Sequence, residues 1–139
     1  MISTKKLLYK VVEKFNGKML MPNTINVNAN VDNVSVASGT EKYVSLYTAS
    51  TSGIFIGSIT IGFPSNSNGI RSVAAARGSS VITEQYMNIP AVNGGQTYIT
   101  IPAIVSLSSG QTLTARVWQN SGSSLTLGVA RARGFLMTN

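Results

Sequence analysis

The sequence has no cysteine and no histidine, and only four of its 139 residues are acidic. Without cysteine and histidine there is no serine–histidine–aspartate triad, no cysteine nucleophile, and no zinc, haem or iron–sulfur site with the usual protein ligands. With only four carboxylates in the chain, we also expect no calcium or magnesium cage built from them. Glu41 and Glu84 would have to meet for glycosidase chemistry, and nothing in the sequence brings them together. We therefore expect a protein that is not an enzyme and that holds no metal and no cofactor.

Long apolar runs are also absent. No stretch approaches the ~18 uninterrupted apolar residues of a membrane span, and charged residues interrupt the apolar ones near the start, so we expect neither a span nor a signal peptide. The net charge is +7, and more than half of the excess lies in residues 1–18, where five lysines accompany one glutamate. The arginines of the remainder are spread over several expected strands, whereas nucleic-acid-binding proteins usually cluster them on one face. We expect no nucleic-acid partner.

Residues 4–16 are predicted to form the one helix of the chain. Their apolar side chains recur with a 3.6-residue period and make one stripe: Leu7, Leu8, Val11, Val12 and Phe15. A helix of ~12 residues is marginal alone in water, so this stripe must be buried against copies of itself, another protein or a lipid surface. We favour docking on another protein and assign residues 1–18 to attachment or oligomerisation.

Residues 19–40 are rich in asparagine. Apolar and amide side chains alternate from Ile25 to Val31, which is the period of a half-buried strand. Two interpretations stay open: an extended linker, or a strand that packs on a neighbouring copy in a stem.

Residues 41–139 are predicted to form an all-β head domain. Apolar and polar residues alternate in segments 43–48, 53–63, 70–76, 81–89, 97–107, 112–119, 125–132 and 135–137. Turns rich in glycine, serine and asparagine separate these segments, and no helical period intervenes. This pattern predicts an antiparallel sandwich or barrel and excludes a βαβ architecture.

Two of these segments are apolar on both faces. Ile54 and Ile56 lie opposite the main apolar face of segment 53–63, and Tyr98 and Ile104 do so in segment 97–107. A strand that is apolar on both faces needs cover on both sides. Another protomer is the simplest cover, and loops folded across the outer face are the alternative.

Several stretches of the head follow the order of one known family: SGIF at 52–55, NSNGIR at 66–71, LSSGQ at 107–111, VWQNSG at 117–122, SL at 124–125 and GFL at 134–136. Together they resemble the C1q/TNF-like jelly roll, in the form found in bacteriophage structural proteins. The resemblance implies a ten-stranded jelly roll that assembles as a homotrimer. A lysine-rich helix before such a head resembles the attachment end of a short phage fibre or knob protein.

The expected function follows from this resemblance. It is a trimeric virion surface protein, such as a head fibre, tail fibre or baseplate knob, that attaches to the host cell surface and docks on other virion proteins through its helix. The alternatives are an architectural capsid or baseplate decoration protein without a ligand, and a secreted or cell-surface bacterial module of the same fold.

The expected ligand is a cell-surface glycan, because recognition here must rely on amides, hydroxyls, guanidinium groups and aromatic stacking. The candidate ligand or interface residues are Asn66, Asn68, Arg71, Arg116, Trp118 and Asn120. Trp118, the sole tryptophan, has the outward parity of its strand and is interpreted as a sugar platform or as an anchor between protomers. Arg116 beside it would contact a carboxylate or line the trimer axis. The asparagines also suit turns for backbone reasons alone.

Overall fold

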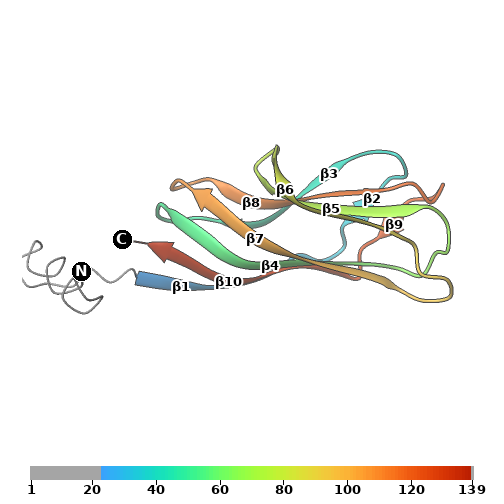
Figure 1. Ribbon diagram of the computed structural model, residues 1–139, viewed down its shortest axis with the longest axis horizontal. Helices are drawn as coiled ribbons and strands as arrows, with labels where there is room; N and C mark the ends of the chain where they lie inside the picture. Colours follow the sequence, from blue (N-terminus) through green and yellow to red (C-terminus); the bar gives the residue numbers. More distant parts are fainter. Residues whose placement is uncertain (1–22, 139) are drawn as a thin grey trace, which may run out of the picture.

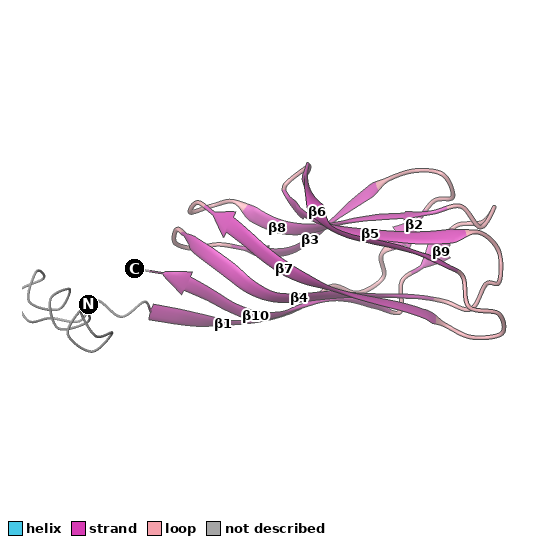
Figure 2. Ribbon diagram, in the orientation of Figure 1, coloured by secondary structure: helices cyan, strands magenta, loops and turns pink. Residues whose placement is uncertain are grey.

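The computed structural model describes residues 23–138, apart from the side chain of Thr83. This part of the chain is all-β, with ten strands and no helix in two packed layers (Figures 1 and 2). The predicted helix over residues 4–16 and its apolar stripe lie outside the described residues. Residues 23–138 contain no helix that is long and apolar enough to cross a membrane.

Two four-stranded antiparallel sheets make up the layers. The first sheet has the order β1 (Asn23–Asn30), β10 (Val129–Thr138), β4 (Gly53–Phe63) and β7 (Thr97–Leu107). The second sheet has the order β3 (Lys42–Thr48), β8 (Thr112–Gln119), β5 (Ile70–Arg77) and β6 (Ser80–Pro90). A short pair, β2 (Ser35–Val36) and β9 (Leu125–Thr126), completes the fold.

The connections between strands are those of a jelly roll. Only β5 and β6 are consecutive in the sequence and adjacent in one sheet, and every other long connection crosses from one sheet to the other. Crossing connections between two antiparallel sheets are typical of a double-sheet jelly roll. The predicted all-β antiparallel sandwich is therefore confirmed.

The core lies between the two sheets and is built by alternation along each strand. In β7 every second side chain is buried, from Thr97 through Ile101 to Leu107. In the second sheet Val73 and Val117 are cross-strand neighbours and are fully buried on the inward side. Because strand side chains alternate between faces, the residues between these positions form the two outer faces of the sandwich.

Residues 23–30 belong to the sandwich itself. The alternation that predicts a linker or stem strand over 19–40 corresponds to β1, which pairs with β10 from Asn23↔Thr138 to Asn30↔Arg131. Val27 of β1 is buried in the core, and the four asparagines of β1 are exposed. Alternation indicates a half-buried strand but does not say which strand is its partner. The head therefore begins before residue 41, and removing residues 1–40 would expose the edge of β10.

Strand β10 is longer than the sequence predicts. The expected segments 125–132 and 135–137 are instead β9 and one continuous strand from Val129 to Thr138, with the break at residues 127–128. Gly134 does not interrupt the strand, because it lies opposite Gly57 of β4. A methyl group on Gly57 would collide with the carbonyl oxygen of Arg133, and one on Gly134 would collide with that of Ile56. The two glycines allow a close backbone approach there.

Both ends of the described chain lie at one end of the sandwich, since Asn23 pairs with Thr138 (Figure 1). The loops formed by residues 64–69, 91–96 and 120–124 lie at the opposite end, which we call the distal end. The described chain therefore begins and ends at the end of the sandwich away from these loops.

Candidate functional site

The outer face of the second sheet carries a groove with a volume of about 660 Å³. This volume lies within the ~300–1,000 Å³ range of small-molecule sites. Nine residues line the groove: Glu41, Ile70, Ser72, Ala74, Val81, Tyr86, Asn88, Arg116 and Trp118. Eight of them come from β5, β6 and β8, and the ninth, Glu41, directly precedes β3.

The groove exists because the middle strand has small outward side chains. Ser72 of β5 lies between Trp118 of β8 and Asn88 of β6 in the strand register. Two residues further along β5, Ala74 lies between Arg116 and Tyr86 in the same way. Large side chains on both neighbouring strands therefore stand above a low floor. The groove runs along β5.

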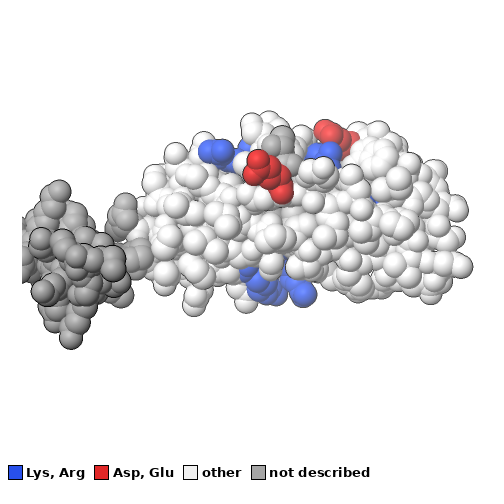
Figure 3. Space-filling model, viewed as in Figure 1, with Lys and Arg blue, Asp and Glu red and all other residues white. Residues whose placement is uncertain are grey.

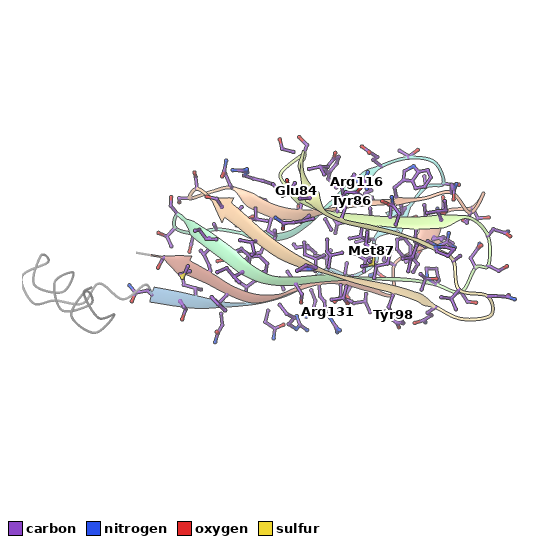
Figure 4. All side chains as sticks on the ribbon, in the orientation of Figure 1. Glu84, Tyr86, Met87, Tyr98, Arg116 and Arg131 are labelled. Carbon is purple, nitrogen blue, oxygen red and sulfur yellow. The ribbon has the colours of Figure 1, made fainter. Side chains whose placement is uncertain are left out.

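Aromatic rings stand on both walls of the groove. Trp118 is half-buried on the β8 wall, and Tyr86 is 58% exposed on the β6 wall. Figure 4 shows Tyr86 and Arg116 together on the outer side of the second sheet, while Tyr98 and Arg131 point from the opposite face of the molecule. Aromatic faces of this kind offer apolar contact to a flat ligand surface such as a sugar ring.

The β6 wall is fixed by a contact with the first sheet. The side-chain amide of Gln85 donates from Nε2 to the backbone oxygen of Ile104 (2.9 Å), and its Oε1 accepts from the Ile104 backbone N–H (2.8 Å). The side-chain amide of Gln85 thus satisfies both backbone groups of Ile104, as a neighbouring strand would do, at the edge strand β7. This link ties the backbone next to Tyr86 to the first sheet.

Arg116 supplies the groove with directional hydrogen-bond donors. Its Nη2 donates to Ser72 Oγ at 2.6 Å, and its Nη1 lies 3.2 Å from Glu41 Oε1. Its Nε is shielded from solvent and has no hydrogen-bond partner. The contact with Glu41 is the one ion pair that the described residues form, and the Glu41 side chain is 51% exposed.

Arg71 has a different place from the one that the sequence predicts for a ligand or interface residue. It is fully buried, its Nη1 donates to the Asn68 backbone oxygen at 2.7 Å, and its Nη2 donates to that of Asn66 at 2.8 Å. Its guanidinium carbon lies 5.7 Å from the centre of the Phe63 ring. Burial lowers the pKa of this guanidinium below its ordinary value. Because position 71 faces inward on β5, Arg71 holds the loop of residues 64–69 and does not reach a surface ligand.

The predicted asparagines lie in the distal loops and serve the backbone there. Asn66 Oδ1 accepts from the Asn68 backbone N–H at 2.9 Å, and Asn120 Oδ1 accepts from that of Ile70 at 2.6 Å. Such contacts are the usual reason for asparagine in turns. The structure therefore places Arg116 and Trp118 in the groove, with the asparagines in loops next to its Ile70 end.

Four polar or aromatic groove residues were not among the sequence candidates: Glu41, Ser72, Tyr86 and Asn88. The sequence does indicate the face of the last three, because alternation along segments 70–76 and 81–89 places their side chains on the outward side of the predicted strands. That signal becomes informative only with the strand register, because the register shows which small side chains lie opposite which large ones.

A second surface lies on the outer face of the first sheet. Phe135, Ile56 and Ile104 are cross-strand neighbours in one row, and Met137 and Ile54 are paired in the next row. We call these five residues the apolar patch. Ile104 is 60% exposed, so the described loops do not provide the cover that one interpretation of the sequence expected. The predicted second apolar face is confirmed.

Charged side chains are sparse on the visible surface (Figure 3). Arg131 lies on the same outer face as the apolar patch, whereas Arg116 lies on the other sheet (Figure 4). Within residues 23–138, no three His, Cys, Asp or Glu side chains gather as a metal-binding group.

Comparison with known proteins gives similarities to solved structures. No protein-family model and no curated protein matches the chain. Among solved structures, the carbohydrate-binding module CBM6cm-2 of Cellvibrio mixtus lichenase 5A, in complex with cellotriose, is similar over 85% of this chain and 86% of that chain, with 20% identity and a TM-score of 0.33. A TM-score this low does not transfer a ligand, so the groove is interpreted below from its own residues.

Proposed function

We propose that the chain is the knob of a trimeric surface protein of a bacteriophage particle, and that its groove binds a glycan of the host cell surface. The groove on the second sheet carries this proposal, because it combines two aromatic walls with fixed polar groups. Trp118 and Tyr86 offer ring faces, while Arg116, Ser72 and Asn88 offer hydrogen-bonding groups. Sugars need both, since a pyranose has an apolar face and a rim of hydroxyls.

The proposed homotrimer is supported by the C1q/TNF-like resemblance of the sequence and by the apolar patch. Exposed Ile54 and Ile104 on an otherwise regular strand face are typical of a protein–protein interface. We assign the patch to contacts between copies of this chain. It lies on the sheet opposite the groove, so assembly through the patch leaves each groove open to solvent.

Attachment to the particle is assigned to residues 1–18, whose apolar stripe would dock on other virion proteins. The described chain starts at the end of the sandwich away from the distal loops, which favours an anchored end and a free end. Three grooves on each knob and many knobs on each particle would give an avidity far above the affinity of a single groove. Weak individual sites are then sufficient for adsorption.

The proposal assigns binding and no reaction to the groove. Glu41 is its single acidic residue, and that carboxylate is engaged with Arg116. Glycoside hydrolysis usually needs two carboxyl groups on either side of the scissile bond. A bound oligosaccharide is therefore expected to be recovered uncleaved.

The test measures glycan binding by the full-length protein and two matched variants. Tyr86→Ala removes a groove tyrosine that is 58% exposed, and Tyr98→Ala removes a tyrosine that is 54% exposed on the other sheet. We expect Tyr86→Ala to weaken the affinity per chain for host cell-surface oligosaccharides about tenfold. Tyr98→Ala should leave that affinity unchanged. Equal losses in the two variants, or no binding by the wild type, would overturn the proposal.

An architectural decoration protein is the second candidate function. The apolar patch favours it, because the patch needs a partner whether or not the groove does. This candidate predicts trimers that incorporate into particles but bind no cell-surface glycan.

A further inference from the structure

The groove already holds a carboxylate, which is supplied by the chain itself. Glu41 Oε1 lies 3.2 Å from Arg116 Nη1 at the β8 wall. A guanidinium group carries five N–H donors and can bind both oxygens of a carboxylate at once. Here Arg116 makes one contact with Glu41 and one with Ser72. Its capacity for a carboxylate is only partly used.

Glu41 is held weakly enough to be displaced. It precedes β3, its side chain is half-exposed, and a single contact longer than the usual charge-assisted hydrogen bond connects it to Arg116. Exposed ion pairs of this kind contribute little to stability. The exchange of Glu41 for another carboxylate would therefore cost the protein little.

The other contacts that position Arg116 do not depend on Glu41. Ser72 on the central strand fixes Nη2 at 2.6 Å, and the backbone of Arg116 is paired on both sides, with Tyr43 of β3 and Ala74 of β5. Trp118 lies two residues further along the same face of β8. A cation and an aromatic face are thus presented side by side on one rigid strand.

We infer that the groove selects a saccharide that bears a carboxylate, with the ligand carboxylate replacing Glu41 on Arg116 while the sugar ring packs on Trp118. This inference rests on the proposed glycan-binding function and names its ligand class. Glu41 is then a built-in competitor: it keeps Arg116 paired in the free protein and repels anions that cannot also use the aromatic wall. Neutral sugars lack the group that displaces it.

The experiment compares acidic sugars with their methyl esters on the full-length protein by calorimetry. The probes are glucuronate, galacturonate and N-acetylneuraminate, each beside its methyl ester, which keeps the ring and removes the charge. We expect at least one acid to bind about tenfold more tightly than its ester. Arg116→Lys should remove this preference, because lysine cannot form the two-pronged contact.

The decisive variant is Glu41→Gln, with Glu84→Gln as its control. Both remove one exposed negative charge from the second sheet, but Glu84 does not line the groove. We expect Glu41→Gln to tighten binding of the acid about three- to tenfold and to leave the ester unchanged, while Glu84→Gln has little effect. Equal binding of acid and ester, or equal effects of the two variants, would overturn the carboxylate inference and leave the glycan function standing. The absence of binding by all six probes would also overturn the carboxylate inference. In that case, a binding assay with neutral oligosaccharides would test the proposed glycan-binding function separately.

Discussion

Trp118 and Tyr86 face one groove from opposite sides, on β8 and β6, with the small side chains of β5 between them. The distance between the walls is set by one intervening strand, since neighbouring strands lie about 4.8 Å apart. The depth is set by Ser72 and Ala74, whose side chains do not reach the height of the walls. The shape of the site thus depends on the small size of these two side chains, one of which, Ser72, also accepts a hydrogen bond from Arg116.

A larger side chain on the groove floor should abolish binding and preserve the fold. Ala74→Leu would place a branched side chain between Arg116 and Tyr86, where the ligand is expected to lie. We expect the affinity for the glycan to fall at least about tenfold. Because Ala74 is fully buried beneath the neighbouring groove side chains, the added atoms must push those side chains aside, and the free energy of unfolding should fall by about 1–3 kcal/mol without loss of the fold. Calorimetry and circular dichroism would measure the two quantities. A variant with normal affinity would show that the ligand does not occupy the groove.

The sequence predicted the strands of the sandwich well where alternation was bounded by turns. Strands β4, β7 and β8 coincide with the predicted segments, because glycine- and serine-rich turns bound segments in which apolar side chains recur at every second position. The same parity placed Trp118 and Arg116 on an outer face. Alternation along one strand is enough to assign a side chain to a face of the sheet, and it needs no information about the other strands.

The groove itself could not be predicted from the sequence, because it depends on the register in which neighbouring strands pair. That Ser72 lies opposite Trp118, and Ala74 opposite Tyr86, follows from pairings between strands far apart in the chain. The partner of β1 is another such pairing. Arg71 was misplaced for a different reason: its charge suggested the surface, whereas its inward parity and the loop carbonyl oxygens of Asn66 and Asn68 provide a buried place.

The glycine pair between β4 and β10 should be intolerant of side chains. Gly134→Ala would drive a methyl group into the backbone of Ile56, so we expect the free energy of unfolding to fall by about 1–3 kcal/mol. Gly95→Ala is the control, since its methyl group would meet one Val92 carbon at 3.7 Å. Denaturant titration would compare the two variants. Equal stability of Gly134→Ala and the wild type would contradict the close approach of the two strands.

Arg71 should stabilise the distal loop without contributing to ligand binding. Arg71→Met would leave the loop carbonyl oxygens of Asn66 and Asn68 without a donor, at a cost of about 1–3 kcal/mol in the free energy of unfolding. Proteolysis within residues 64–69 should accelerate, while the affinity for acidic sugars stays within about twofold. Loss of sugar binding from a folded Arg71→Met protein would place the site in the distal loops.

A charge in the apolar patch should separate the protomers. Sedimentation of the full-length protein is expected to give three times the mass of the chain. Ile104→Asp should reduce this to the mass of one chain, because assembly would bury an unpaired carboxylate. Thr100→Asp, on the same face of β7 but outside the apolar patch, tests whether any added charge has this effect. A folded wild-type monomer would contradict the proposed trimer.

The most direct test of the central claim uses the fluorescence of Trp118, which is the only tryptophan in the chain. Titration of the full-length protein with bacterial cell-surface oligosaccharides, acidic members included, would follow emission while calorimetry follows binding. We expect a saturable blue shift with the same midpoint as the calorimetric curve, since a sugar ring on the indole face excludes water. Calorimetric binding with unchanged Trp118 emission, or no binding by any of the oligosaccharides, would contradict it.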